Sequence, residues 1–311
     1  MFGAMLLSSI VLSLLLSVAA QGPSIDRQIA FLVNSSSPQI NYPTDFTQNI
    51  VPKPIHSHND YWRQVPLLTA LSLGVASVEA DVWLFNGTLF VGHELAALTP
   101  NRTFSSLYVE PLMQILAMQN PKDDFTVNQT GINGVFDMAG SIPLQLLVDI
   151  KTDGVETLPF VQAQLEPLRA RGYLTTFTNG TLRESAITVV GTGNTPLDPV
   201  KALEPRDFFF DAPLNQLTDP SLNTTWGPGL SPLASVDWNI AVGWSGIGNI
   251  SATQLGNLTQ FVNDAHSLGI RARYWDLPGW PISARTAIWE TLILSGVDWL
   301  NADDLEAAAN F

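Results

Sequence analysis

Histidines and carboxylates recur in the middle of this 311-residue chain at spacings that suit catalysis. The motifs, in chain order, are His56-Ser57-His58, Glu79-Ala80-Asp81, a single His93 and Asp149-Ile150-Lys151. Side chains two residues apart on an extended strand project from the same face. Glu79 and Asp81 are therefore expected to point the same way, and so are Asp149 and Lys151.

Carboxylates at the ends of neighbouring strands repel one another unless a cation lies among them. Oxygen ligands suit a hard divalent ion, so we expect Glu79, Asp81 and Asp149 to bind Mg²⁺, with Ca²⁺ as the alternative. A histidine on each side of such an ion could act as general base and general acid in cleaving a phosphodiester. His56 and His93 are the candidates.

Further residues are expected to complete the site. Lys151 could steady a phosphate oxygen. Trp275 ends a run in which Arg271, Arg273 and Trp275 alternate, and it could contact the apolar or sugar part of a substrate or belong to the core. Asp211 is one more carboxylate at a strand end.

Structural readings compete with each of these assignments. Glu79 and Asp81 could form a solvated edge, although the apolar residues around them favour burial. Asp149 and Lys151 could be a buried salt bridge, and His266 on a helical pattern is expected to be structural.

The pair His56 and His58 leaves a choice open. Both can face the site if the first strand reaches His58. If the strand ends at Ile55, one histidine acts and the other orients it, with Asn59 or Asp60 as hydrogen-bond partner. We favour His56 as the acid–base residue and keep His58 in the site.

The chain alternates short apolar runs with helical patterns. Expected strands cover 54–58, 77–85, 144–152, 186–190, 207–211, 233–238, 270–275 and 297–301. Helical patterns cover 66–74, 104–119, 158–172, 255–269 and 282–296, and the last two end in glycine directly before a strand.

This alternation predicts parallel βαβ units. Over about 250 residues, a closed eight-stranded TIM-type (β/α)8 barrel is favoured over an open doubly wound sheet. Asn86-Gly87 predicts a β-hairpin after the second strand, with its return arm in 88–94. Residues 121–141 read as an inserted loop, and the fourth to sixth units have the weakest helical patterns.

The composition of the chain excludes several classes of function. The net charge of -14 argues against a nucleic-acid partner, and the absence of cysteine excludes disulfides and thiolate chemistry. The uncharged residues 1–20 read as a secretory signal peptide, followed by an N-terminal arm (21–52) and the barrel (53–311). After cleavage we expect no stable membrane anchor.

Eight Asn-X-Ser/Thr sequons support a secreted, N-glycosylated protein. They begin at Asn34, Asn86, Asn101, Asn128, Asn179, Asn223, Asn249 and Asn257.

The order of the motifs resembles the phospholipase-C-like phosphodiesterase superfamily, which includes glycerophosphodiester phosphodiesterases and venom sphingomyelinases D. The strings HSHNDY, VEADVW, VGHE and RYWDLP are more specifically similar to the fungal altered inheritance of mitochondria protein 6 family. This resemblance implies a TIM-type barrel, acid–base histidines at His56 or His58 and at His93, and a metal at Glu79, Asp81 and Asp149.

The chain also departs from the common glycerophosphodiesterase pattern. Ser57 stands where an arginine would follow His56, and Arg63 could take over its contact with phosphate. The expected partner is a small phosphodiester or a phospholipid head group, hydrolysed or cyclised. Two alternatives stay open: a secreted glycoside hydrolase that uses a carboxylate pair, and a non-catalytic barrel.

Overall fold

The computed structural model describes residues 24–311, so the predicted signal peptide (1–20) lies outside the described residues. The chain divides into two compact units at Pro43 and Thr44. In the first unit, α2 (Ile25–Asn34) begins after Ser24, whose side chain accepts a hydrogen bond from the backbone N–H of Arg27, and η1 (Pro38–Ile40) follows. No helix of residues 24–311 is long and apolar enough to cross a membrane.

The second unit begins nine residues before the predicted barrel boundary at Lys53. The reason is the short helix η2 (Asp45–Thr47), which packs within this unit. The buried Thr47 hydroxyl donates a hydrogen bond of 2.5 Å to the carbonyl of Val135. Residues 44–52 therefore belong to the barrel unit and not to the preceding segment.

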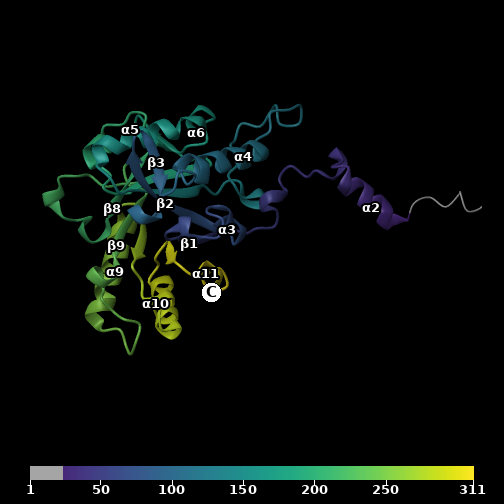
Figure 1. The fold of residues 1–311 in the computed structure, drawn as a ribbon. Helices are drawn as coiled ribbons and strands as arrows, with labels where there is room; N and C mark the ends of the chain where they lie inside the picture. Colours follow the sequence, from purple (N-terminus) through teal and green to yellow (C-terminus); the bar gives the residue numbers. More distant parts are fainter. Residues whose placement is uncertain (1–23) are drawn as a thin grey trace, which may run out of the picture. The chain divides into compact units, whose positions relative to one another are not determined.

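Eight parallel strands form a nearly closed barrel, as the sequence predicts (Figure 1). In order they are β1 (Lys53–Ser57), β2 (Val75–Phe85), β4 (Leu144–Ile150), β7 (Ile187–Gly193), β8 (Phe209–Pro213), β9 (Leu233–Asp237), β10 (Arg271–Trp275) and β11 (Leu300–Ala302). Each pairs with its neighbour in the chain, and β11 returns to β1. Between β10 and β11 the strand pairing within residues 24–311 is reduced to an isolated bridge from Arg273 to Trp299, the residue before β11.

The register aligns polar residues across the first strands. His56 in β1 pairs with Asn301 in β11 and with Ser77 in β2, and Ser77 pairs with Gln145 in β4. Two residues further along, Glu79 and Asp81 occupy the same face of β2 as Ser77. The alternate residues Val78, Ala80 and Val82 are fully buried on the other face, as the sequence predicts.

The crossover helices match the strongest helical patterns. They are α3 (Leu68–Ser72), the π-helix η5 (Ser105–Val109) with α4 (Glu110–Gln119), α5 (Gly154–Gln164) with α6 (Glu166–Ala170), α9 (Ala252–Ser267) and α10 (Ile282–Leu294). Both α9 and α10 end before glycines with positive φ, Gly269 (71°) and Gly296 (81°), which open the turns into β10 and β11. In Figure 1, α5 and α6 lie on one side of the strands and α9 and α10 on the other.

The fourth to sixth units are the irregular ones. The fourth carries only α7 (Leu197–Lys201), the fifth carries η7 (Leu214–Gln216) and η8 (Pro220–Leu222), and the sixth places α8 (Trp238–Ala241) before α9. The barrel unit also contains η3 (Asp60–Trp62), η4 (Leu95–Ala97) and η6 (Asp137–Ala139), and it ends with α11 (Leu305–Ala309).

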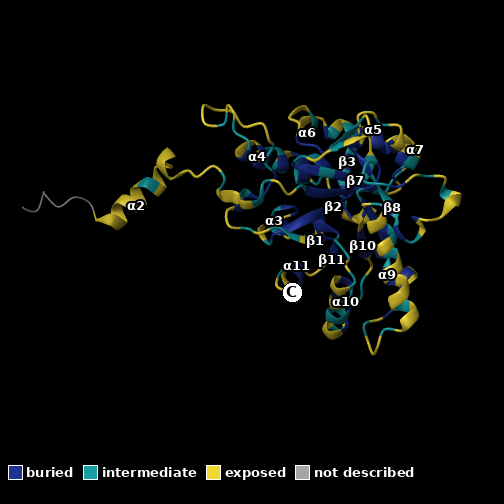
Figure 2. Cartoon of the chain, turned by 180° about the vertical axis from the view of Figure 1, so that it is seen from behind, coloured by how far each residue is buried: buried dark blue, intermediate teal, exposed yellow. Residues whose placement is uncertain are grey.

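Two hairpins interrupt the alternation. The predicted one joins β2 to β3 (Thr88–Val91) across Asn86 and Gly87, which both have positive φ. A second hairpin, β5 (Thr176–Thr178) with β6 (Thr181–Arg183), was not predicted. It turns at Asn179-Gly180, which is the same two-residue signal and also has positive φ. Figure 2 shows the buried residues concentrated on the strands and the exposed residues on the outer helices and loops.

Candidate active site

An acidic cluster lies at the carboxyl ends of two adjacent strands. Glu79 and Asp81 come from β2 and Asp149 from β4, and one oxygen of each lies within 4.8 Å of the others. Asp81 pairs with Asp149 in the parallel register, which brings the two side chains side by side. The three carboxylates therefore lie close together, as the sequence predicts.

Two cations balance part of this charge. Lys151 Nζ lies 2.9 Å from Asp81 Oδ2 and 2.9 Å from Asp149 Oδ2. From the barrel interior, Arg273 Nη2 approaches Glu79 Oε1 to 3.8 Å. Burial and the neighbouring Glu79 charge raise the pKa of Asp81 to about 7, although Lys151 opposes the shift. Burial raises the pKa of Asp149 in the same direction.

Glu79 behaves differently from its two neighbours. Burial disfavours its charged form, but the contact with His56 and the charge of Arg273 outweigh burial, so the pKa of Glu79 lies well below its usual value. The backbone N–H of Asn59 also donates a hydrogen bond of 3.0 Å to Glu79 Oε2. One permanent anion therefore stands at the centre of the cluster.

The cluster has unused capacity for a cation. Asp81 Oδ1 and Asp149 Oδ1 are buried and have no hydrogen-bond partner within residues 24–311. Buried carboxylate oxygens are rarely left without a partner, and hard divalent ions take such oxygens as ligands. These residues therefore fit a divalent ion held by Glu79, Asp81 and Asp149.

His56 is fully buried at the end of β1. Its Nδ1 lies 2.7 Å from the hydroxyl of Ser77, and its Nε2 lies 3.5 Å from Glu79 Oε2. Burial and the nearby Arg273 charge lower the pKa of His56 to about 3, so the imidazole is neutral at physiological pH. β1 ends at Ser57, so the strand runs past Ile55 and stops one residue short of His58, between the two limits considered for it.

His58 lies just beyond the end of β1, and its side chain is more exposed to solvent than that of His56. Its Nδ1 contacts Asp303 Oδ1 at 2.8 Å, and its side chain is 23% exposed. Arg63 holds this segment in place, because one guanidinium nitrogen donates to the His58 carbonyl at 2.7 Å and another donates to the carbonyl of Asp303. In this structure Arg63 therefore bridges two loops by contacts with backbone carbonyls.

His93 follows the hairpin strand β3 and faces Asp81 from the other side. Its Nδ1 lies 3.5 Å from Asp81 Oδ2 and 3.2 Å from the hydroxyl of Tyr61. Half of its side chain is exposed, and its ring packs edge-on against Trp62 with 5.3 Å between ring centroids. His56 thus contacts the Glu79 side of the Glu79–Asp81 pair and is buried. His93 contacts the Asp81 side and is half exposed to water.

Tyr61 shapes the site although it carried no role in the sequence analysis, and it does so together with Asn59, a predicted hydrogen-bond partner. The hydroxyl of Tyr61 lies 2.8 Å from Asp81 Oδ2 and also contacts Asn59 Oδ1. Asn59 adopts the left-handed conformation (φ 51°), which lets the chain turn sharply after His58. Positive φ suits asparagine, so the Asn59-Asp60 pair after a strand was the readable signal for this turn.

Asp60 stabilises the same loop through three hydrogen bonds. Its carboxylate accepts hydrogen bonds from the Ser57 hydroxyl (2.8 Å), the backbone N–H of Leu67 (2.6 Å) and the Tyr108 hydroxyl (3.1 Å). Burial raises the pKa of Asp60 to about 6 despite these hydrogen bonds. Asp60 thus serves the loop rather than either histidine, whereas Asn59 touches the ring of His58 at 3.4 Å.

The remaining candidates are spread along the barrel. Trp275 ends β10 and is 38% exposed, while Arg273 is buried and Arg271 lies at the opposite, amino end of the strand. Asp211 in β8 is half-buried with one carboxylate oxygen fully buried, and burial raises its pKa to about 7. His266 on α9 pairs with Asp298 at 2.8 Å, away from the acidic cluster, in agreement with the structural role predicted for it.

Comparison with known proteins places this geometry in a family. Residues 44–211 match the AIM6-like phosphodiesterase domain. The altered inheritance of mitochondria protein 6 homolog of Arthroderma benhamiae is 44% identical over 292 residues, which are 90% of each chain. Altered inheritance of mitochondria protein 6 of Eremothecium gossypii is 38% identical over 83% of this chain and 69% of that protein.

Among solved structures, a glycerophosphodiester phosphodiesterase from Parabacteroides distasonis matches with a TM-score of 0.45 and 12% identity, covering 83% of this chain and 96% of that one. A likeness of this size says nothing about the substrate. The match to the AIM6-like phosphodiesterase domain, over residues 44–211, covers β1, β2, β3 and β4. The acidic cluster and the three histidines around it all lie within this range. The chain therefore belongs to the altered inheritance of mitochondria protein 6 family and contains an AIM6-like phosphodiesterase domain.

Proposed function

We propose that the protein is a metal-dependent phosphoric diester hydrolase. The observation that carries this proposal is the buried cluster of Glu79, Asp81 and Asp149, in which two carboxylate oxygens have no partner. A divalent ion bound there would supply positive charge to a phosphoryl oxygen and to the attacking or leaving group. Mg²⁺ is the ion we propose, with Ca²⁺ as the alternative.

The side chains around the cluster have separate proposed roles in proton transfer and phosphate binding. His93 is half exposed, so it can exchange protons with water and is the proposed carrier of the proton that enters or leaves the reacting group. Lys151 already spans Asp81 and Asp149 and would steady a phosphate oxygen next to them. His56, the second acid–base candidate from the sequence, is buried on the other side of the cluster beside Glu79.

The substrate class is a small phosphodiester or a phospholipid head group. Trp275 ends β10, and Trp62 ends η3, which follows the carboxyl end of β1. They are 38% and 57% exposed, so they offer apolar surface at the carboxyl ends of the strands. The excess of acidic residues in the whole chain disfavours polyanionic substrates such as nucleic acids.

A panel of phosphodiesters tests the proposal. Lysophospholipids, glycerophosphodiesters and a chromogenic bis-phosphodiester would be incubated with the purified protein in Mg²⁺, in Ca²⁺ and in EDTA. We expect turnover of at least one substrate with a divalent ion and none in EDTA. Turnover that survives EDTA would refute the metal role, and a folded protein inactive on the whole panel would favour the non-catalytic barrel.

We also propose that the protein enters the secretory route and is N-glycosylated. All eight sequon asparagines are exposed, which is what an oligosaccharide requires. Three of them, Asn86, Asn179 and Asn223, lie in turns with positive φ. Removal of N-glycans from protein secreted by a fungal host should lower its apparent mass. An intracellular protein with unchanged mass would refute this proposal.

A further inference from the structure

The barrel interior holds a hydrogen-bonded row that begins at His56 and ends at the opposite end of the barrel. Ser77 Oγ lies 2.7 Å from His56 Nδ1, and Gln145 Nε2 donates to the same Oγ at 2.8 Å. The three residues are register partners on β1, β2 and β4, so the strand pairing holds them in line. All three are buried, with at most 4% exposure.

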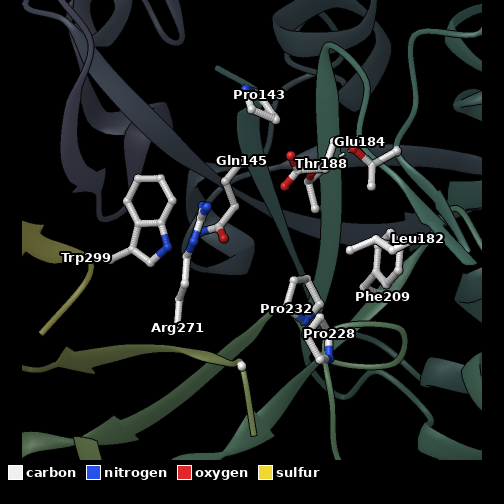
Figure 3. A pocket seen from close by; sticks show the side chains of 12 residues that line it. Pro143, Gln145, Leu182, Glu184, Thr188, Phe209, Pro228, Pro232, Arg271 and Trp299 are labelled. Carbon is white, nitrogen blue, oxygen red and sulfur yellow. Dashed lines mark hydrogen bonds between the residues drawn. The ribbon is translucent and has the colours of Figure 1, made fainter. Parts of the chain in front are cut away.

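Gln145 ends this row at a cavity. The cavity is lined by the first residues of several strands, including Thr188 of β7, Phe209 of β8 and Arg271 of β10. Arg271 lines the same cavity as Gln145, and Figure 3 shows both side chains among its lining residues. A cation in this cavity favours the orientation in which the amide oxygen turns toward the cavity and the amide nitrogen turns to Ser77.

Counting donors and acceptors then determines the direction of each hydrogen bond. A serine hydroxyl has one hydrogen and two lone pairs. One lone pair of Ser77 accepts from Gln145, and within residues 24–311 the only other hydrogen-bonding contact of this oxygen is His56 Nδ1. If Nδ1 carried the proton, the Ser77 hydrogen would be left without an acceptor in a dry interior, which is costly.

The other ring nitrogen leads to the same tautomer. His56 Nε2 is buried, has no hydrogen-bond partner in the described chain, and lies 3.5 Å from Glu79 Oε2. A bare lone pair facing an ionised carboxylate would be repelled, whereas an N–H directed at it is attracted.

We propose that Gln145 and Ser77 are positioning residues that fix neutral His56 with its proton on Nε2. On the proposed function, which this inference presupposes for its catalytic part, His56 then directs its Nε2–H toward Glu79 and orients this carboxylate within the acidic cluster. Proton transfer is left to His93, which is exposed to water.

The test reads the tautomer directly, without substrate. Long-range ¹⁵N–¹H spectra of the full protein, with ¹⁵N-labelled imidazoles, give the protonation of each ring nitrogen, and only four histidines have to be assigned. His56→Gln identifies the His56 signals. We expect a protonated Nε2 and a bare Nδ1, and the opposite pattern in the wild-type protein would overturn the proposal.

A matched pair of variants tests the direction of the row. In Gln145→Glu the carboxylate can only accept, so Ser77 donates to it and accepts from His56, and the proton should move to Nδ1. Arg271, which lines the same cavity as position 145, compensates part of the new charge. Gln145→Met has similar length but no acceptor, so the proton should stay on Nε2. A tautomer unchanged in Gln145→Glu, with native circular dichroism, would overturn the proposal.

Kinetics test the catalytic part separately. With the substrate found in the panel, Ser77→Ala and Gln145→Glu should lower kcat about 10–100-fold at little change in KM, the usual range for residues that orient a catalytic group. Thr188→Val, which lines the same cavity outside the row, should stay within about twofold of wild type. If no variant changes kcat although the tautomer moves, the tautomer of His56 has no role in catalysis. If the wild-type protein turns over nothing, the proposed function fails while the tautomer assignment stands.

Discussion

Lys151 Nζ lies 2.9 Å from Asp81 Oδ2, at the carboxyl ends of two neighbouring strands. The lysine is three-quarters buried and Asp81 almost completely so, which makes this pair the main internal neutralisation of the acidic cluster. The carboxylates of this cluster also accept hydrogen bonds from the Asn59 backbone and the Tyr61 hydroxyl. The same carboxylates are the proposed ligands of the ion.

Lys151→Met should destabilise the ion-free protein. Removing one partner of a buried ion pair leaves a carboxylate uncompensated and costs about 3 kcal/mol. Added Mg²⁺ should recover more stability in the variant than in wild type, because the ion replaces the lost positive charge. Thermal unfolding in EDTA and in Mg²⁺ measures both effects. The control Lys201→Met removes a surface contact of 3.9 Å with Asp198 and should change stability by less than about 0.5 kcal/mol.

Glu79→Gln should abolish stabilisation by the divalent ion. An ion present at about 100 times its Kd stabilises the folded protein by about 2.7 kcal/mol, and a neutral amide at the centre of the cluster removes most of that gain. The midpoint of thermal unfolding is followed as Mg²⁺ is added. Glu156→Gln, on the exposed surface of α5, should respond like wild type. An unchanged Mg²⁺ response in Glu79→Gln would place the ion elsewhere.

Tyr61→Phe should weaken the site more than the fold. Loss of the hydroxyl leaves Asp81 and Asn59 without a shared partner, at a cost of about 1–3 kcal/mol, and activity should fall about 10–100-fold. Tyr173→Phe is the matched control, because Tyr173 is equally buried but donates to the carbonyl of Leu116, away from the acidic cluster. Unequal activity with similar stability supports the role of Tyr61, and equal activity in the two variants would contradict it.

Asp60 should make stability fall as the pH rises from about 4 to 7. Its pKa is about 6 in the folded protein and near the ordinary 3.8 when unfolded. Between these values the folded state holds a proton that the unfolded state has lost, so the stability conferred by protonated Asp60 disappears as pH increases through 6. The shift corresponds to about 3 kcal/mol.

Asp60→Asn isolates this contribution, because asparagine does not titrate. Urea unfolding of both proteins at several pH values gives the difference in unfolding free energy. We expect wild type to lose about 2.4 kcal/mol relative to the variant between pH 4 and 7. A difference that is independent of pH would show that Asp60 is not protonated in the folded state.

Much of the fold was readable in the sequence because strands and helices have different periods. The strand run around Glu79 and Asp81 combines apolar and acidic residues on alternate faces, and α9 and α10 each end where a glycine permits a positive φ. The hairpin at Asn179-Gly180 was missed although its turn carries the same signal as Asn86-Gly87. The start of β8 came two residues later than predicted; Asp207, which precedes it, contacts Arg169 Nε at 2.5 Å.

Within the site, the sequence by itself determined which chemical groups are available and which of them share a strand face. It paired Glu79 with Asp81 and placed His56 at a strand end, since these follow from the two-residue period of a strand. It could not determine what stands across from each residue. Register between strands depends on long-range packing, and a slip changes every neighbour. Only the tertiary structure put Ser77 and Gln145 behind His56 and directed Arg273 toward Glu79.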